Sequence, residues 1–218
     1  MTMQVGLIGS NGIVLASDMK WGVPPPWDAE LVRRGFLASK ILISDSGKLA
    51  VGFAQSMYPA YRAAKRLIAE LDDSDERTRD SRIYDIGRDE AGKENVEFIL
   101  AFLEPAPTLR LFQWFNGGKD ILNSPVRESL HTGDHHNPAI AWLRYYKKKP
   151  IKKLKLLAAH VVTIAGEISP DGIKGLELIY SNATGFHRVS DDENDNLQIQ
   201  SRALDRQVGD AILNGNPL

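Results

Sequence analysis

The sequence predicts an α+β domain built from antiparallel sheets and flanking helices. Three observations point there: paired short apolar strands joined by tight turns near the start, an amphipathic helical block after them, and a repetition of both patterns further along. Strand-rich blocks that alternate with helical blocks, with hairpin connections, are typical of layered α+β folds. Two sheets packed face to face would leave outer faces that helices could cover.

Two hairpins account for most of the first 54 residues. The first pairs Val5 to Ile8 with Ile13 to Ala16 across a Gly-Ser-Asn-Gly turn, which is a strong hairpin signal. The second pairs Lys40 to Ser44 with Lys48 to Ala54 across an Asp-Ser-Gly turn. In its second strand apolar and small or polar residues alternate, which suits a half-buried strand.

The segment Trp21 to Ser39, between the hairpins, contains three consecutive prolines, Pro24-Pro25-Pro26. Such a run cannot lie inside a helix or a central strand, so we expect an inserted loop. Trp21 and Trp27 flank the prolines, and either a core-edge position or a contact between subunits would suit them.

The rest of the chain repeats the alternation of helices and strands. The first helix should bury the positions that recur at steps of three and four: Met57, Tyr61, Ala64, Ile68 and Leu71. Residues 72–94 are charge-dense and are expected to form mainly surface, with at most a short helix. The further expected elements are strands at Val96–Leu103, Leu109–Phe115 and Val126–Leu130, helices at Ala139–Tyr146 and Pro150–Ile168, and strands at Gly175–Tyr180 and Gly185–Val189.

Length and composition favour one folded domain over residues 1–218, with a polar C-terminal extension from about residue 190 that has weak helical character around Arg202 to Leu213. Lys plus Arg number 27 against 28 for Asp plus Glu, and this near-neutral balance argues against a nucleic-acid binder. The absence of cysteine excludes disulfides and thiolate chemistry. No stretch has the roughly 20 apolar residues of a membrane span. A cytoplasmic protein without a membrane partner is expected.

Two stretches carry a resemblance to a known family. Thr2 to Asp18 reads TMQVGLIGSNGIVLASD, and Lys40 to Ala60 reads KILISDSGKLAVGFAQSMYPA. Both are similar to the proteasome β-subunit family of N-terminal-nucleophile (Ntn) hydrolases, as in a divergent bacterial-type member. The resemblance implies a four-layer αββα sandwich, assembly of identical subunits into a ring, and hydrolysis of peptide bonds inside it. It implies peptide or unfolded-protein substrates, an ATPase unfoldase as a further partner to consider, and no cofactor or metal.

The chemistry of such a site explains its residue types. A threonine hydroxyl is a weak nucleophile and needs a base. Once Met1 is removed, the α-amino group of Thr2 can serve, because a terminal amine has a pKa of about 7.7–8.0. A nearby ammonium lowers that pKa and stabilises developing negative charge. The resemblance implies that Lys40 is this cation and that Asp18 keeps it charged and oriented.

The family's supporting positions fall on less typical residues here. Gln55 stands where the family has a glycine whose main-chain N–H helps to form the oxyanion hole. Thr132-Gly133 stands in place of a serine-glycine pair close to the nucleophile. Ser169 and Asp171 are candidates for the later support positions, with Glu167 as a further occupant, and this choice stays open.

The first hairpin provides a geometric expectation. A two-residue turn over Asn11-Gly12 would point Asp18 to the face opposite Thr2. A three-residue loop from Ser10 to Gly12 would pair Asp18 with Gln4 and bring it to the Thr2 face. Catalysis by Thr2 therefore predicts the three-residue loop or an equivalent bulge, and a two-residue register without a bulge speaks against it.

Two other clusters have structural explanations. His131, Asp134, His135 and His136 lie within six residues, but adjacent histidines rarely converge on one metal, and a helix cap is the favoured role. The lysine run from 147 to 155 is best explained as an exposed helix junction.

Two other functions compete with a threonine protease. One is an assembly subunit without catalysis, and the other is an Ntn amidohydrolase for a small substrate.

Overall fold

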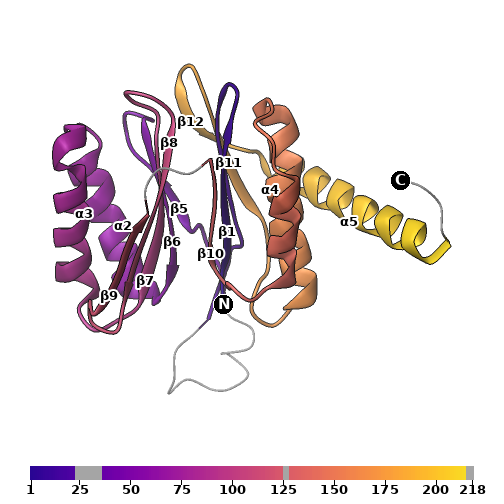
Figure 1. Ribbon diagram of the computed structural model, residues 1–218, viewed down its shortest axis with the longest axis horizontal. Coiled ribbons are helices and arrows are strands. Elements are labelled where there is room, and N and C mark those ends of the chain that lie inside the picture. The colour runs from indigo at the N-terminus through magenta and orange to yellow at the C-terminus, as the bar shows by residue number, and fades with distance from the viewer. Residues whose placement is uncertain (23–35, 125–127, 215–218) are drawn as a thin grey trace.

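Two five-stranded antiparallel sheets stack face to face in the computed structural model, which describes residues 1–22, 36–124 and 128–214 (Figure 1). The first sheet has the order β10-β1-β2-β11-β12, with β1 at Met3–Gly9, β2 at Gly12–Ser17, β10 at Ser129–Gly133, β11 at Glu177–Asn182 and β12 at Gly185–Arg188. The second runs in chain order through β5 at Ile41–Ile43, β6 at Leu49–Gln55, β7 at Val96–Phe102, β8 at Thr108–Phe115 and β9 at Asp120–Ser124. A two-stranded ribbon joins β3, Lys20–Trp21, to β4, Phe36–Leu37.

Helices cover both outer faces. On the second sheet lie α2, Met57–Leu71, and α3, Glu76–Ala91. On the first sheet lies α4, Ile151–Ile168, which also contacts α5, Asp191–Asn214, and the short 3-10 helix η1, Pro138–Tyr145. Figure 1 shows the resulting helix–sheet–sheet–helix order and the far end of α5 extending away from the body. The expected four-layer αββα sandwich is confirmed.

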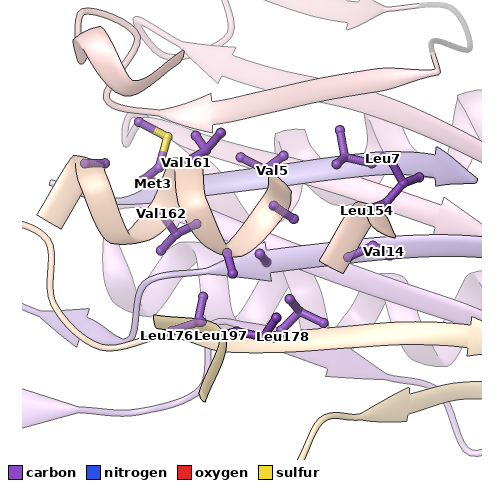
Figure 2. Packing of buried hydrophobic residues seen from close by; sticks show 14 of the residues in the cluster. Met3, Val5, Leu7, Val14, Leu154, Val161, Val162, Leu176, Leu178 and Leu197 are labelled. Carbon is purple, nitrogen blue, oxygen red and sulfur yellow. The ribbon is translucent and has the colours of Figure 1, made fainter. Parts of the chain in front are cut away.

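Alternation along β1 assigns its side chains to two layers. Met3, Val5 and Leu7 pack towards α4, as Figure 2 shows. Ile8 belongs instead to the apolar cluster between the two sheets. Because successive side chains of a strand point to opposite faces, the polar side chain of Gln4 also points between the sheets, where it is buried. The site therefore starts at the end of a strand that is covered on both sides.

Three expected elements differ from the structure. Residues 76–91 form a full helix, α3, since Asp75 caps it and Ile83, Ile86 and Ala91 are buried against the second sheet. The tail forms a 24-residue helix, α5, whose first half is held by α4. The strand expected at 126–130 lies at Ser129–Gly133 instead, while residues 125–127 fall outside the described part of the chain.

The buried face of α2 is shifted from the expected one. Tyr61 is 43% exposed. The fully buried positions are Ala60, Ala63, Ala64, Leu67 and Leu71. The alanines let the helix pack closely on β6, and tertiary contact thereby overrides the pattern of large apolar residues.

The turn of the first hairpin is also shorter than expected. Two residues, Ser10 and Asn11, connect β1 to β2, since Gly9 lies opposite Gly12. The register brings Asp18 opposite Met3, whose carbonyl accepts the Asp18 N–H at 3.0 Å. The three-residue loop is therefore wrong, and alternation alone would turn Asp18 away from Thr2.

The helices that the structure describes include none with the length and apolar character that crossing a bilayer requires.

Candidate active site

Thr2, Lys40 and Asp18 form a buried chain of hydrogen bonds at one end of the inter-sheet layer. The Lys40 Nζ lies 2.9 Å from the Thr2 Oγ1 and 2.9 Å from the Asp18 Oδ2. The side chains of Lys40 and Asp18 are both 0% exposed. An ammonium so placed can stabilise negative charge on the threonine oxygen, and the carboxylate keeps its orientation.

Asp18 reaches Lys40 because its carboxylate, in place of its carbonyl oxygen, accepts the Met3 N–H at the end of the β1–β2 ladder. The carbonyl oxygen of Asp18 accepts from the Ser17 Oγ at 2.8 Å, so it is turned out of the ladder. The Met3 N–H donates instead to the Asp18 Oδ1 at 2.9 Å. The Lys20 N–H donates to the other carboxylate oxygen at 3.1 Å. These bonds place the carboxylate beyond the strand end, where side-chain alternation no longer applies.

Burial changes the acid–base properties of this pair. It lowers the pKa of Lys40, while attraction to Asp18 opposes the shift. It raises the pKa of Asp18, against the attraction of Lys40 and the hydrogen bonds that it accepts. The Trp21 ring, 4.9 Å from the Lys40 Nζ, adds a cation–π contact. Trp21 itself is buried and packs at a tilt against the Phe53 ring, with ring centroids 5.7 Å apart.

Gln4 ties the two sheets together beside the lysine. Its Nε2 donates to the main-chain oxygens of Lys40 at 3.3 Å and Phe53 at 2.9 Å. The Gly52 Cα faces the Gln4 amide so closely that an added Cβ would lie 3.0 Å from it. The sequence signal of this contact is a single glutamine within the otherwise apolar strand MQVGLIG.

The main chain of Lys40 is held from the other sheet by Glu177. The Lys40 N–H donates to the Glu177 Oε2 at 2.9 Å. The other carboxylate oxygen accepts from Ser39 and from Arg188, whose guanidinium also bonds the Ile41 carbonyl. The start of β5 is thereby fixed against β11, and with it the position of the lysine side chain.

Gly133 lies against the main chain of Thr2, while Thr132 pairs with Gln4 in the β1–β10 ladder. Asp134 donates its N–H to the Thr2 carbonyl at 2.7 Å. Gly133 has φ +99°, and a Cβ there would lie 2.0 Å from the same carbonyl oxygen. Only glycine fits this close approach. Thr132 is fully buried, and its Oγ1 has no hydrogen-bond partner among the described residues.

Gln55 ends β6 at the mouth of the site in an unusual conformation. Its φ is +77°, a region that favours glycine. Its side-chain Nε2 donates to the Glu97 Oε1 at 2.7 Å. Glu97 is 0% exposed in β7 and also accepts the Gly133 N–H at 3.0 Å. Glu97 is the one charged residue of the apolar strand sequence VEFILAF, a signal that the sequence analysis missed.

The later candidate positions lie further from the threonine hydroxyl. Ser169 ends α4, and its Oγ accepts from Asn137 at 3.4 Å. The main-chain oxygen of Asp171 accepts from the Lys20 Nζ, whereas the Asp171 side chain is exposed. Glu167 is exposed and pairs with Arg202. None of these three side chains contacts Thr2 in the described part of the chain.

A cleft of about 720 Å³ opens beside Thr2. Its walls include Trp21, Gln55, Tyr58, Gly133 and His135. This volume is large enough to hold part of an extended peptide or a drug-sized ligand.

The histidine cluster borders this cleft without converging. His135 contacts Glu97 and Gln113, and its ring lies 5.6 Å from that of His131. Within the described ranges, no group of three or more histidine, aspartate or glutamate side chains could hold a metal ion. Asn137, rather than Asp134, caps η1. Trp27 and most of the inserted loop fall in the undescribed positions 23–35.

Fold and site together define an αββα protein with a buried threonine–lysine–aspartate group at the end of its two inner sheets. Solved structures with this architecture include Anbu proteins. The Anbu (ancestral beta-subunit) from Yersinia bercovieri is 12% identical, with a TM-score of 0.69 and 97% of each chain covered. The Gly-1 mutant of Anbu from Hyphomicrobium sp. strain MC1 is 15% identical, with a TM-score of 0.68 over 95% of this chain and 96% of that one.

A third structure, the helical assembly of the Anbu complex from Pseudomonas aeruginosa, is 14% identical, with a TM-score of 0.70 over 99% of this chain and 97% of that one. No family model matches the chain, and no curated protein does. The expected membership of the proteasome β-subunit family is therefore wrong: the opening motifs reflect a shared fold, and at these identities the comparison shows the fold alone.

Proposed function

We propose that the protein is a threonine-type hydrolase of peptide bonds that uses Thr2 as nucleophile once Met1 has been removed. The contact of the buried Lys40 ammonium with the Thr2 Oγ1, at 2.9 Å, is the observation that carries the proposal. A cation buried beside a hydroxyl has little structural value by itself, since burial of charge is costly. It is useful where negative charge develops on that oxygen.

The proposed reaction has two halves. The neutral α-amino group of Thr2 takes the hydroxyl proton, and the Oγ1 attacks the substrate carbonyl carbon. The main-chain N–H of Gln55 donates to the carbonyl oxygen as it becomes negative. Collapse of this adduct breaks the C–N bond, and the ammonium returns the proton to the departing amine. Water then hydrolyses the ester on Thr2, with the amine again as base, and frees the acid product.

The surroundings favour a neutral amine. Burial lowers the pKa of the Met1 amino group below its ordinary value of 8.0, and the charge of Lys40 lowers it further. An amine on Thr2, one residue nearer to that lysine, would be exposed to the same cation. It would then be available as a base at neutral pH.

We further propose that the chain associates with itself, so that the cleft opens into an enclosed space. The Anbu complex from P. aeruginosa forms a helical assembly, which supports self-association of this fold. Peptides and unfolded segments would be the substrates, and delivery by an ATPase unfoldase would belong to the same proposal.

The experiment combines intact mass with turnover. Protein lacking Met1 should hydrolyse fluorogenic peptides, Thr2→Ala should lose more than about 1,000-fold in kcat, and Thr2→Ser should retain measurable turnover, because the serine keeps both the hydroxyl and the amine. Unchanged cleavage by Thr2→Ala would refute the proposal. Quantitative retention of Met1 would instead favour an assembly subunit without catalysis.

A further inference from the structure

Glu97 is a buried carboxyl group that the proposed reaction does not use. It is fully buried, and its carboxyl group accepts hydrogen bonds from the Gln55 side chain and the Gly133 N–H and lies 3.3 Å from the His135 Nε2, all around the cleft. Gln55 and His135 share the Oε1, and the Gly133 N–H occupies the Oε2. An ionised carboxylate is tolerated inside a protein only when donors surround it. These donors all belong to the walls of the candidate site.

Gln55 adopts an unfavourable main-chain conformation at the position where its side chain contacts Glu97. A left-handed φ of +77° is unfavourable for a residue with a Cβ such as glutamine. Such an outlier persists only where its surroundings hold it in place. The 2.7 Å bond from the Gln55 Nε2 to the carboxylate is the contact that can do so.

The main chain of Gln55 faces the cleft. Along β6 the Phe53 N–H donates to the Lys40 carbonyl at 3.0 Å, so the Gln55 N–H, two residues on, points to the same side. The last β5–β6 pair is Ile41 with Gly52. The Gln55 donor therefore lies beyond the end of that ladder, on the side of the strand where Lys40 approaches Thr2.

Glu97 also holds the opposite wall. The Gly133 N–H donates to it from the first sheet, and Gly133 packs directly on the Thr2 carbonyl. One carboxylate thus joins the second-sheet wall, at Gln55, to the first-sheet wall, at Gly133. Any shift of either wall would change the distance between Thr2 and the Gln55 donor.

We propose that Glu97 is a positioning residue that holds Gln55 in its left-handed conformation and so aims the Gln55 main-chain N–H at the carbonyl oxygen of the substrate. This inference rests on the proposed function, because it assigns the donor a role in that reaction. Glu97 itself touches no reacting atom. Its effect should appear in kcat rather than in KM.

Turnover by Met1-free protein provides the first measurement. Glu97→Gln should lower kcat about 30- to 100-fold and change KM less than about threefold, because a displaced oxyanion donor weakens only the transition state. Glu104→Gln is the matched control, since Glu104 follows the same strand β7 and its side chain is 61% exposed beside Lys48. It should leave both constants unchanged.

Two substitutions at Gln55 distinguish the effect of its main-chain conformation from the effect of its side-chain amide. Gln55→Leu and Gln55→Gly both delete the Nε2 donor, but only glycine adopts a positive φ without strain. Gln55→Leu should therefore lose kcat as Glu97→Gln does, and Gln55→Gly should lose at least tenfold less. Adding Glu97→Gln to Gln55→Gly should lower kcat at least fivefold less than Glu97→Gln does in the wild-type background, since glycine needs no partner to hold its positive φ and only the Gly133 contact is then disturbed. The comparison of Gln55→Leu with Gln55→Gly tests the role of the Gln55 conformation even if Glu97→Gln fails to fold.

Unfolding by urea provides a measurement that needs no activity. Gln55→Gly should raise the unfolding midpoint in the Glu97→Gln background, where the strained residue has lost its partner, and should not raise it in the wild-type background. If wild-type protein lacks Thr2-dependent turnover, the proposed function fails, and these midpoints still decide whether Glu97 holds Gln55. Equal midpoint shifts in the two backgrounds, or equal kcat losses in Gln55→Leu and Gln55→Gly, would overturn the positioning role.

Discussion

At the scale of single residues, the buried ion pair of Lys40 and Asp18 lies beside the Thr2 hydroxyl. The protonation states of these two side chains therefore control the charge next to that hydroxyl. Burial disfavours both charged forms, whereas the 2.9 Å ion pair favours them. Removing either partner would leave an uncompensated buried charge, which is strongly destabilising. The pair is therefore a unit, and its ionisation should limit activity at one end of the pH range.

The pH dependence of kcat/KM should be bell-shaped. On the acid side the Thr2 amine must lose its proton. In the chain that keeps Met1 the terminal amine has a pKa lowered from 8.0 by burial and by Lys40. The Thr2 amine of the processed chain faces the same lysine, so activity should extend below pH 8. On the alkaline side Lys40 becomes neutral as the pH rises through its pKa, which burial lowers from 10.5. Activity should therefore fall before pH 10.5.

Lys40→Arg is the control for the alkaline limb. A guanidinium stays charged throughout this range, so the limb should move to higher pH even where the absolute rate is reduced. An alkaline limb at the same pH in both proteins would show that another group causes it.

At the scale of elements, the site depends on how closely the end of β10 approaches the start of β1. Gly133 pairs with Met3 in this ladder, and its Cα packs on the Thr2 carbonyl. The Asp134 N–H completes the contact. No side chain fits between the two strands at this point, so the threonine main chain is held by backbone alone.

Gly133→Ala should destabilise the protein by about 3 kcal/mol, since its Cβ would lie 2.0 Å from the Thr2 oxygen at φ +99°. Gly117→Ala is the comparison, because φ is +66° there but the nearest atom is 3.8 Å away, and about 1 kcal/mol is expected. Urea denaturation of both variants measures the difference. Equal losses would mean that the contact with Thr2 has no energetic role.

At the scale of the whole molecule, the open question is the geometry in which copies of this αββα sandwich associate. A heterologous contact, in which two different surfaces of identical copies meet, produces a closed ring when successive rotations bring the last copy back to the first. Otherwise it produces an open helix. A ring is expected from the sequence, while the Anbu complex from P. aeruginosa forms a helical assembly. Self-association is common to both outcomes.

Light scattering of the purified protein should give a mass several times that of one chain, and electron microscopy of the same sample should separate closed rings from open helices. A single-chain mass at micromolar concentration would contradict the proposed self-association, since an enclosed space needs several subunits.

Local patterns alone predicted much of the architecture. Turn residues and alternation located β1, β2, β6 and the β11–β12 pair, because a half-buried strand imposes its period on the sequence. The full length of the charge-dense helix α3 and the first half of α5 were not predicted, since their few apolar positions become significant only beside a sheet or α4.

The residue types of the candidate site, Thr2, Asp18 and Lys40, could be named from the sequence by itself, together with the strands that bear or adjoin them. Their convergence was decided by the tertiary structure. Alternation from the observed turn would have turned Asp18 away, and it is the Met3 N–H that draws its carboxylate to Lys40. Glu97 likewise acquires its donors only where the two sheets meet. Buried polar groups take their positions from partners distant in the chain, which no local pattern records.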